Sequence, residues 1–146
     1  MVGGGIVGGL NIFENAIVSY AQMEEDLRYK IDNIEVTHPG YDEYRRNVGH
    51  IGTNPNYIIA LILALDDMPE HLLSGLLEQI FNRQYTLVLD SFTQELEIEN
   101  DDGEIEIVEI YVLEITLTVI PFREAIVPLL TPEQLLQFDH FMSIGG

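Results

Sequence analysis

The sequence predicts an α+β fold, in which N-terminal helices precede one long bent antiparallel β-hairpin and C-terminal helices pack on that hairpin. Two changes of period predict this order. Apolar residues recur at helical spacing as far as Phe81, alternate with polar residues from Tyr85 onward, and return to helical spacing after Pro121. The chain has 146 residues, of which 47% are hydrophobic, and this suits one domain with a true core.

The two ends of the chain frame this domain. Residues 1–10 are rich in glycine and predict a flexible lead-in, while residues 145–146 predict the start of a linker. The single α+β domain is therefore expected over residues 11–144. The opening stretch lacks the basic region and the cleavage site of a signal peptide.

A long first helix is expected after the lead-in. Asn11 is its predicted cap, and apolar residues at helical spacing continue to about Ile34. Glu24, Glu25 and Asp26 interrupt this apolar stripe, so we expect all three to face water.

The next segment predicts a short amphipathic helix. Tyr41, Tyr44 and Val48 recur at positions i, i+3 and i+7, directly after a Pro-Gly break. On such a helix Asp42 and Arg46 would form an i, i+4 ion pair.

Two buried helices are expected before the hairpin. Asn54 predicts a helix cap with Pro55 in the first turn, and the apolar run at 58–65 predicts a helix at the centre of the core. A third helix is expected to start at Asp67 as its cap. Gly75 within that helix is explained by close packing against another helix.

The hairpin is strongly acidic near its turn. Asp102-Gly103 predicts a two-residue turn, and phase slips at Asp90-Ser91 and near Val108 predict bulges. This register sets Asp101 opposite Glu104, Glu99 opposite Glu106 and, allowing for the bulge near Val108, Glu97 opposite Glu109. Like charges on three successive rungs destabilise a strand pair. The ribbon is thus a candidate surface for a basic protein partner or for weak collection of divalent cations, with screening by water and salt as the simpler explanation. The residues of this candidate surface are Glu97, Glu99, Asp101, Glu104, Glu106 and Glu109.

The C-terminal part predicts two helices. Pro121 ends the second strand, and residues 122–130 predict a short helix limited by proline. Thr131 and Gln134 have the spacing of a capping box, which predicts the start of a last helix.

Composition excludes several classes of function. The formal net charge is −19, so nucleic acid and anionic membrane surfaces would repel the chain. There is no cysteine, which excludes disulfides, thiolate zinc sites and a cysteine nucleophile. The histidine spacing fits no zinc motif, and an EF-hand at the turn would place Ile98 at its first ligand position. We therefore predict no cofactor, no metal site and no catalytic residue.

One stretch carries a resemblance to a known family. The sequence HPGYDEYR from His38, then Ile-Gly-Thr-Asn-Pro and an apolar helix, resembles a module in cell-wall hydrolases of conjugative transposons from clostridial-type Gram-positive bacteria. Later stretches fit as well, so that the resemblance spans about His38 to Gly146. Thr53 stands where that family often has histidine. The motif residues, which we expect to be structural, are His38, Pro39, Gly40, Tyr41, Asp42, Glu43, Tyr44, Arg45, Gly52, Asn54 and Pro55.

The resemblance implies a context for the chain. Proteins of that family join a membrane anchor, a module of this kind and a C-terminal peptidoglycan hydrolase. It therefore implies that the chain is a piece of an extracytoplasmic, cell-surface protein. The chain itself would be non-catalytic and would space, position or oligomerise the enzyme within the transfer apparatus. Two alternatives are a self-contained cell-wall lytic enzyme and a stand-alone acidic protein-binding domain.

Overall fold

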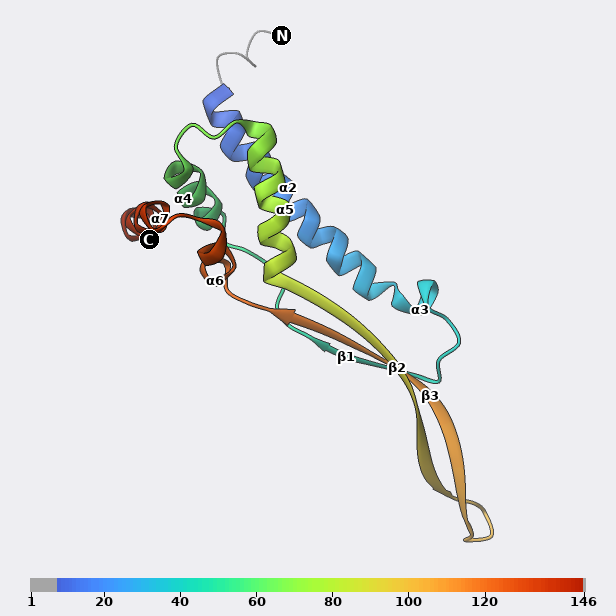
Figure 1. Cartoon of the computed structure of the whole chain (residues 1–146). Coiled ribbons are helices and arrows are strands. Elements are labelled where there is room, and N and C mark those ends of the chain that lie inside the picture. Colours follow the sequence, from blue (N-terminus) through green and yellow to red (C-terminus); the bar gives the residue numbers. More distant parts are fainter. Residues whose placement is uncertain (1–7, 146) are drawn as a thin grey trace.

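The computed structural model describes residues 8–145, with side chains from residue 12 onward, and its helices and mixed sheet confirm the α+β class. Figure 1 shows the helices gathered at one end and a long hairpin extending away from them. The elements in chain order are α2 (Gly8–Asp32), α3 (Ile34–Thr37), β1 (Glu43–Val48), α4 (Pro55–Leu65), α5 (Glu70–Gln84), β2 (Tyr85–Glu99), β3 (Ile105–Val119), α6 (Phe122–Ile126), the 3-10 turn η1 (Val127–Leu129) and α7 (Pro132–Gly145).

The helices at the two ends extend further than predicted. α2 begins at Gly8, so residues 8–10 belong to a helix and not to the lead-in, and residues 1–7 lie outside the described part. Gly145, predicted as the start of a linker, is the last residue of α7, and Gly146 lies outside the described part. Glycine inside a helix costs only about 1 kcal/mol relative to alanine, and the helix can absorb this.

Residues 43–48 form strand β1, and the helix predicted there is wrong. β1 pairs in parallel with β3, from Glu43 opposite Val112 to Val48 opposite Leu117. Three apolar residues at helical spacing are a weak signal over so short a segment, and the pairing with β3 satisfies the backbone in the extended form. Arg46 consequently pairs with Glu35 of α3 and not with Asp42.

The sheet has the strand order β1-β3-β2, with β2 and β3 antiparallel. Residues pair one to one along the whole hairpin, from Tyr85 opposite Val119 to Glu99 opposite Ile105, so both predicted bulges are wrong. Residues that face each other across an antiparallel pair point to the same side of the sheet. Odd-numbered residues of β2 and β3 therefore share one face and even-numbered residues share the other.

The phase slip in the sequence marks a change of apolar face. Near the helices the odd-numbered residues are apolar, and Leu113, Ile115 and Leu117 are buried in one cluster with residues of the helices. Beyond Ser91 the apolar residues of β2 are even-numbered. We call the odd-numbered face the helix-side face and the even-numbered face the outer face.

The central helix prediction is confirmed at its start. Asn54 Oδ1 accepts a hydrogen bond from the Asn56 amide (2.9 Å), and Pro55 is the first residue of α4. Leu61 is fully buried, and α4 packs mainly on α7 and α2. α6 packs on α5, so the C-terminal helices complete a helical layer beside the sheet.

The start of α5 differs from the prediction. Its N-cap is Pro69 without a side-chain hydrogen bond, and the two aspartates before it have positive φ, 49° at Asp66 and 59° at Asp67. A Cβ added at Gly75 would meet nothing within 4 Å, so close packing does not explain that glycine.

The capping box before α7 is confirmed. The Thr131 amide donates to Gln134 Oε1 (2.9 Å), and the Gln134 amide donates to Thr131 Oγ1 (3.1 Å). The stretch predicted as one short helix before it divides into α6 and η1.

Candidate interaction surface

The hairpin continues well beyond the third strand of the sheet. β1 pairs with β3 only over Val112–Leu117, so from Gln94 opposite Ile110 to the turn the ribbon consists of β2 and β3 alone. We call this ribbon, residues 94–110, the arm. Figure 1 shows it projecting away from all helices. A two-stranded ribbon without cover is marginal in water, which makes the arm unusual as a purely structural element.

The outer face of the arm carries an apolar stripe. Leu96 lies opposite Val108, and the neighbouring rungs place further apolar residues on the same face. The members of this apolar stripe are Leu96, Ile98, Val108 and Ile110 on the arm and Phe92 just before it on the same face. They are partly buried against one another, except Ile98, which is exposed. The sequence signal for the stripe was the phase slip at Asp90-Ser91, which the prediction interpreted as a bulge.

The predicted acidic residues divide between both faces and the turn. Glu97 and Glu99 lie on the helix-side face with Glu109, while Glu106 lies on the outer face opposite Ile98. Asp101 lies in the turn and Glu104 directly follows it. The six residues thus do not form one continuous acidic surface.

The turn explains why the predicted register was wrong. The Asn100 amide donates to the Glu104 carbonyl (2.8 Å), and the Gly103 amide donates to the Asn100 carbonyl (3.0 Å). Asn100 Oδ1 also accepts from the Asp102 amide (3.0 Å) and the Glu104 amide (2.9 Å), and Gly103 has φ 80°. A three-residue loop of this kind, closed by a left-handed glycine, replaces the predicted two-residue turn.

The shift of register changes the charge pairs on the arm. Glu104 faces Asn100 and not Asp101, and such a one-residue slip moves every partner to the other face. Glu97 and Glu99 now face Ile107 and Ile105, so all three predicted like-charge rungs are absent. Glu95 opposite Glu109 is the like-charge rung on the arm.

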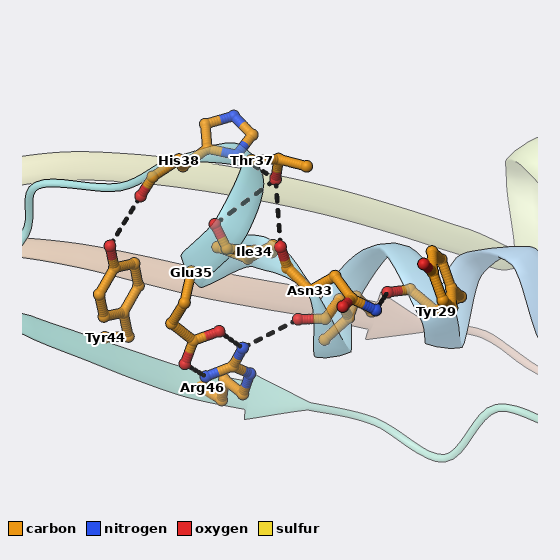
Figure 2. Close-up of polar contacts among 9 residues, drawn as sticks. Tyr29, Asn33, Ile34, Glu35, Thr37, His38, Tyr44 and Arg46 are labelled. Atoms are coloured by element: carbon orange, nitrogen blue, oxygen red, sulfur yellow. Dashed lines mark hydrogen bonds and ion pairs between the residues drawn. The ribbon is translucent and has the colours of Figure 1, made fainter.

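The residues of the family-like motif hold the chain between α3 and β1. Figure 2 shows the Tyr44 hydroxyl donating to the carbonyl of His38 (2.7 Å), at the end of α3. It also shows Arg46 donating to Glu35. Arg46 donates as well to the Ile31 carbonyl (2.9 Å). Between them, the chain turns through Pro39 and Gly40, and Gly40 has φ 98°. These contacts support the structural role expected for His38, Gly40 and Tyr44.

Other motif residues join the start of β1 to strands β3 and β2. Asp42 donates its amide to the Tyr111 carbonyl (2.8 Å) and accepts from the Tyr111 amide through Oδ2 (2.8 Å). Arg45 pairs with Glu43, donates to Gln94 Oε1 (2.5 Å) and lies over the Phe92 ring at 5.8 Å. The ring of Tyr41 packs edge-on against that of Tyr44 at 5.7 Å.

A buried polar network was not predicted. Glu24 is only 5% exposed, which corrects the expectation that it faces water. The hydroxyls of Tyr85 and Thr53 both donate to Glu24 Oε2, the Thr53 contact at 2.7 Å. Tyr20 donates to Gln84 Oε1 (2.5 Å) in the same region, and the Gly52 amide donates to the Tyr85 hydroxyl (3.1 Å). Thr53 thus joins two helices and the sheet.

The polar groups of this network are hydrogen-bonded to one another, and the network lies next to a shallow cavity. Burial raises the pKa of Tyr20 well above its usual range, and burial followed by the Glu24 hydrogen bond raises the pKa of Tyr85, so both stay neutral donors. Thr53 and Gln84 line a cavity of about 480 Å³, and Glu24 is not among its lining residues. A carboxylate engaged in this way stabilises the fold and is poorly placed for acid–base chemistry.

No protein-family model, curated protein sequence or solved structure matches the chain. Within residues 8–145, no helix is long and apolar enough to cross a membrane. Over the same residues, no three histidine, aspartate or glutamate side chains gather closely enough to hold a metal ion.

Proposed function

We propose that the chain is a non-catalytic interaction module that docks a protein partner through its arm. The observation that carries this proposal is the apolar stripe on the outer face of a ribbon that no helix within residues 8–145 covers. Most of the stripe is half-buried and Ile98 is 46% exposed, so the stripe still presents apolar surface to solvent, and contiguous apolar patches mark interaction sites. The arm is also long enough to reach a partner at a distance from the helices.

The family resemblance supplies the biological context of this proposal. In it, the chain is an extracytoplasmic part of a membrane-anchored peptidoglycan hydrolase encoded by a conjugative element. The chain spaces, positions or oligomerises that enzyme in the transfer apparatus. Structural use of the motif residues around His38 and of the Glu24 network supports a non-catalytic role, because these polar groups already satisfy one another.

The experiment compares DNA transfer with hydrolysis in the full-length parent protein. Leu96→Asn with Ile110→Asn disrupts the apolar stripe, and Val88→Asn is the matched control on the outer face near the helices, where Val88 is 52% exposed. We expect the stripe variant to lower the frequency of conjugative transfer while peptidoglycan hydrolysis by the purified parent is unchanged. Unchanged transfer would contradict the docking role.

A second assay addresses catalysis directly. The purified chain, incubated with labelled peptidoglycan, is expected to release no muropeptides. Release that is abolished by Glu24→Gln would instead establish the alternative of a self-contained lytic enzyme.

A further inference from the structure

β3 has an open edge along the arm. Over Val112–Leu117 its two neighbours are β1 and β2, but from Ile105 to Ile110 its one strand neighbour within the described residues is β2. Asp42 marks the end of the covered part, because its amide and carboxylate both bind the backbone of Tyr111 at 2.8 Å. In Figure 1, β1 accompanies the hairpin near the helices and does not reach the tip.

The alternation of hydrogen bonds identifies the backbone groups on this edge. Tyr111 binds Asp42, and the Leu117 carbonyl accepts from the Gly49 amide (3.1 Å), so odd-numbered residues of β3 point towards the β1 side. Backbone direction alternates along a strand. Ile105, Ile107 and Glu109 therefore present their N–H and C=O groups to the open edge.

The open edge carries only acidic charges, at Glu106 and Glu109, as protection against strand addition, and these would not repel a basic strand. Soluble proteins block such edges with charged side chains, above all lysine, and with proline, bulges or a covering segment. Residues 105–111 contain neither lysine nor proline, and the ladder has no bulge. Ile105 and Ile107 are each 66% exposed beside this edge. The edge is thus suited to accept a further strand.

The negative charge of the hairpin favours a basic strand as the one that would be added to this edge. Residues 84–122 include ten aspartates and glutamates and no lysine or arginine. A second copy of this acidic chain would bring like charges together along the seam, while a basic strand would meet complementary charge. Glu106 and Glu109 flank the edge on its two faces.

We propose that the open edge of β3 pairs with an extended basic segment of the partner protein, which adds a strand in line with β1. This inference rests on the proposed docking function and names the chemistry of its partner. Main-chain hydrogen bonds supply affinity in such strand addition, and alternating side chains supply specificity. The added strand would alternate lysine or arginine with β-branched residues, so that it contacts both the glutamates and the isoleucines.

A short fluorescent peptide in which lysine alternates with valine is the probe. Binding to the intact chain is measured by fluorescence anisotropy, and the free edge is followed through the amide signals of Ile105, Ile107 and Glu109 by NMR. Ile107→Pro removes one outward N–H without removing a hydrogen bond to β2, so the hairpin persists. We expect this variant to weaken binding by about tenfold or more.

Thr93→Pro is the matched control, because Thr93 points to the other free edge, on the far side of β2. It is expected to change the dissociation constant by less than about twofold, since that edge is not used. The same peptide with N-methyl groups on its pairing edge should bind the wild-type chain as weakly as the unmodified peptide binds the Ile107→Pro variant.

Three results would overturn the proposal. The first is that the wild-type chain and Ile107→Pro bind the peptide equally well, and the second is that both proline variants lose the same amount of affinity. The third is a dimer that forms without peptide in sedimentation and that Ile107→Pro abolishes, because this would assign the edge to a second copy. If the peptide fails to bind while the stripe variant still lowers transfer, the edge proposal fails and the docking function stands.

Discussion

Glu24 shows how far the environment of one residue can depart from its local pattern. It stands in a run of three acidic residues, yet its side chain is buried and accepts hydrogen bonds from Thr53 and Tyr85. Glu25, its neighbour, lies at the surface and pairs with Arg28 at 2.7 Å. The two positions therefore form a natural pair for mutation.

Glu24→Ala is expected to lower the free energy of unfolding by about 1–3 kcal/mol, because the hydroxyls of buried Tyr85 and half-buried Thr53 lose their acceptor. Glu25→Ala, the control, should cost no more than about 1 kcal/mol, since it removes only a surface ion pair. Urea denaturation followed by circular dichroism measures both. Equal effects of the two substitutions would show that the buried network does not stabilise the fold.

The ion pair of Glu35 with Arg46 is expected to make part of the stability of the fold sensitive to acid. Its hydrogen bonds and ion pair with Arg46 lower its pKa from 4.5 to about 2. A lowered pKa in the folded state means that the ionised carboxylate stabilises the fold above pH 4.5, and that this contribution disappears as the pH falls from 4.5 to about 2. NMR titration of the Glu35 carboxyl should show this value, and Arg46→Gln should move it back towards 4.5. An unchanged titration in the variant would contradict the assigned cause.

At the scale of elements, α4 contributes to the core of the helical layer through one of its faces. Leu61 is fully buried, and Leu63, on the same helix, is 42% exposed. Leu61→Ala should therefore cost about 2–5 kcal/mol in the free energy of unfolding, as large-to-small changes in cores do. Leu63→Ala is the control and should cost clearly less. Thermal and urea unfolding of both variants test whether α4 is central to the core.

The like-charge rung of the arm offers a test of the cation hypothesis. Glu95 faces Glu109, and Glu109→Lys should raise stability by about 0.2–1 kcal/mol at low salt because it replaces repulsion by attraction. Glu97→Lys is the control, since Glu97 faces Ile107.

If divalent cations collect on this ribbon, millimolar calcium or magnesium should raise the wild-type melting temperature above that in sodium chloride of equal ionic strength. Equal melting temperatures would leave the protein partner as the remaining hypothesis.

At the scale of the whole molecule, the buried core and the arm are separate parts of the fold. The buried core lies in the helices and the nearby part of the sheet, and the arm extends beyond it. Replacing residues 95–109 by Asn-Gly, which joins Gln94 to Ile110, should shift the melting temperature by no more than about 4 °C. Calorimetry on the trimmed chain, with Leu61→Ala as a destabilised reference, checks this. A larger fall would mean that the arm supports the core.

The sequence by itself determined the features that depend on residues close together in the chain. The Asn54 cap, the Thr131–Gln134 capping box, the long first helix and the hairpin all follow from local hydrogen bonds or from the period of apolar residues. The acidic character of the arm also follows from composition alone. These features could be predicted because their partners lie within a few residues.

Only the tertiary structure decided which distant segments meet. β1 is a strand because β3 pairs with it, although Val48 and Leu117 are far apart in the chain. Glu24 is buried because Thr53 and Tyr85 come to it from other elements. The hairpin register depended on the side chain of Asn100, which favours a three-residue loop. The open edge of β3 exists because β1 begins only at Glu43, opposite Val112, and a pairing that covers part of a strand leaves no mark in the local sequence.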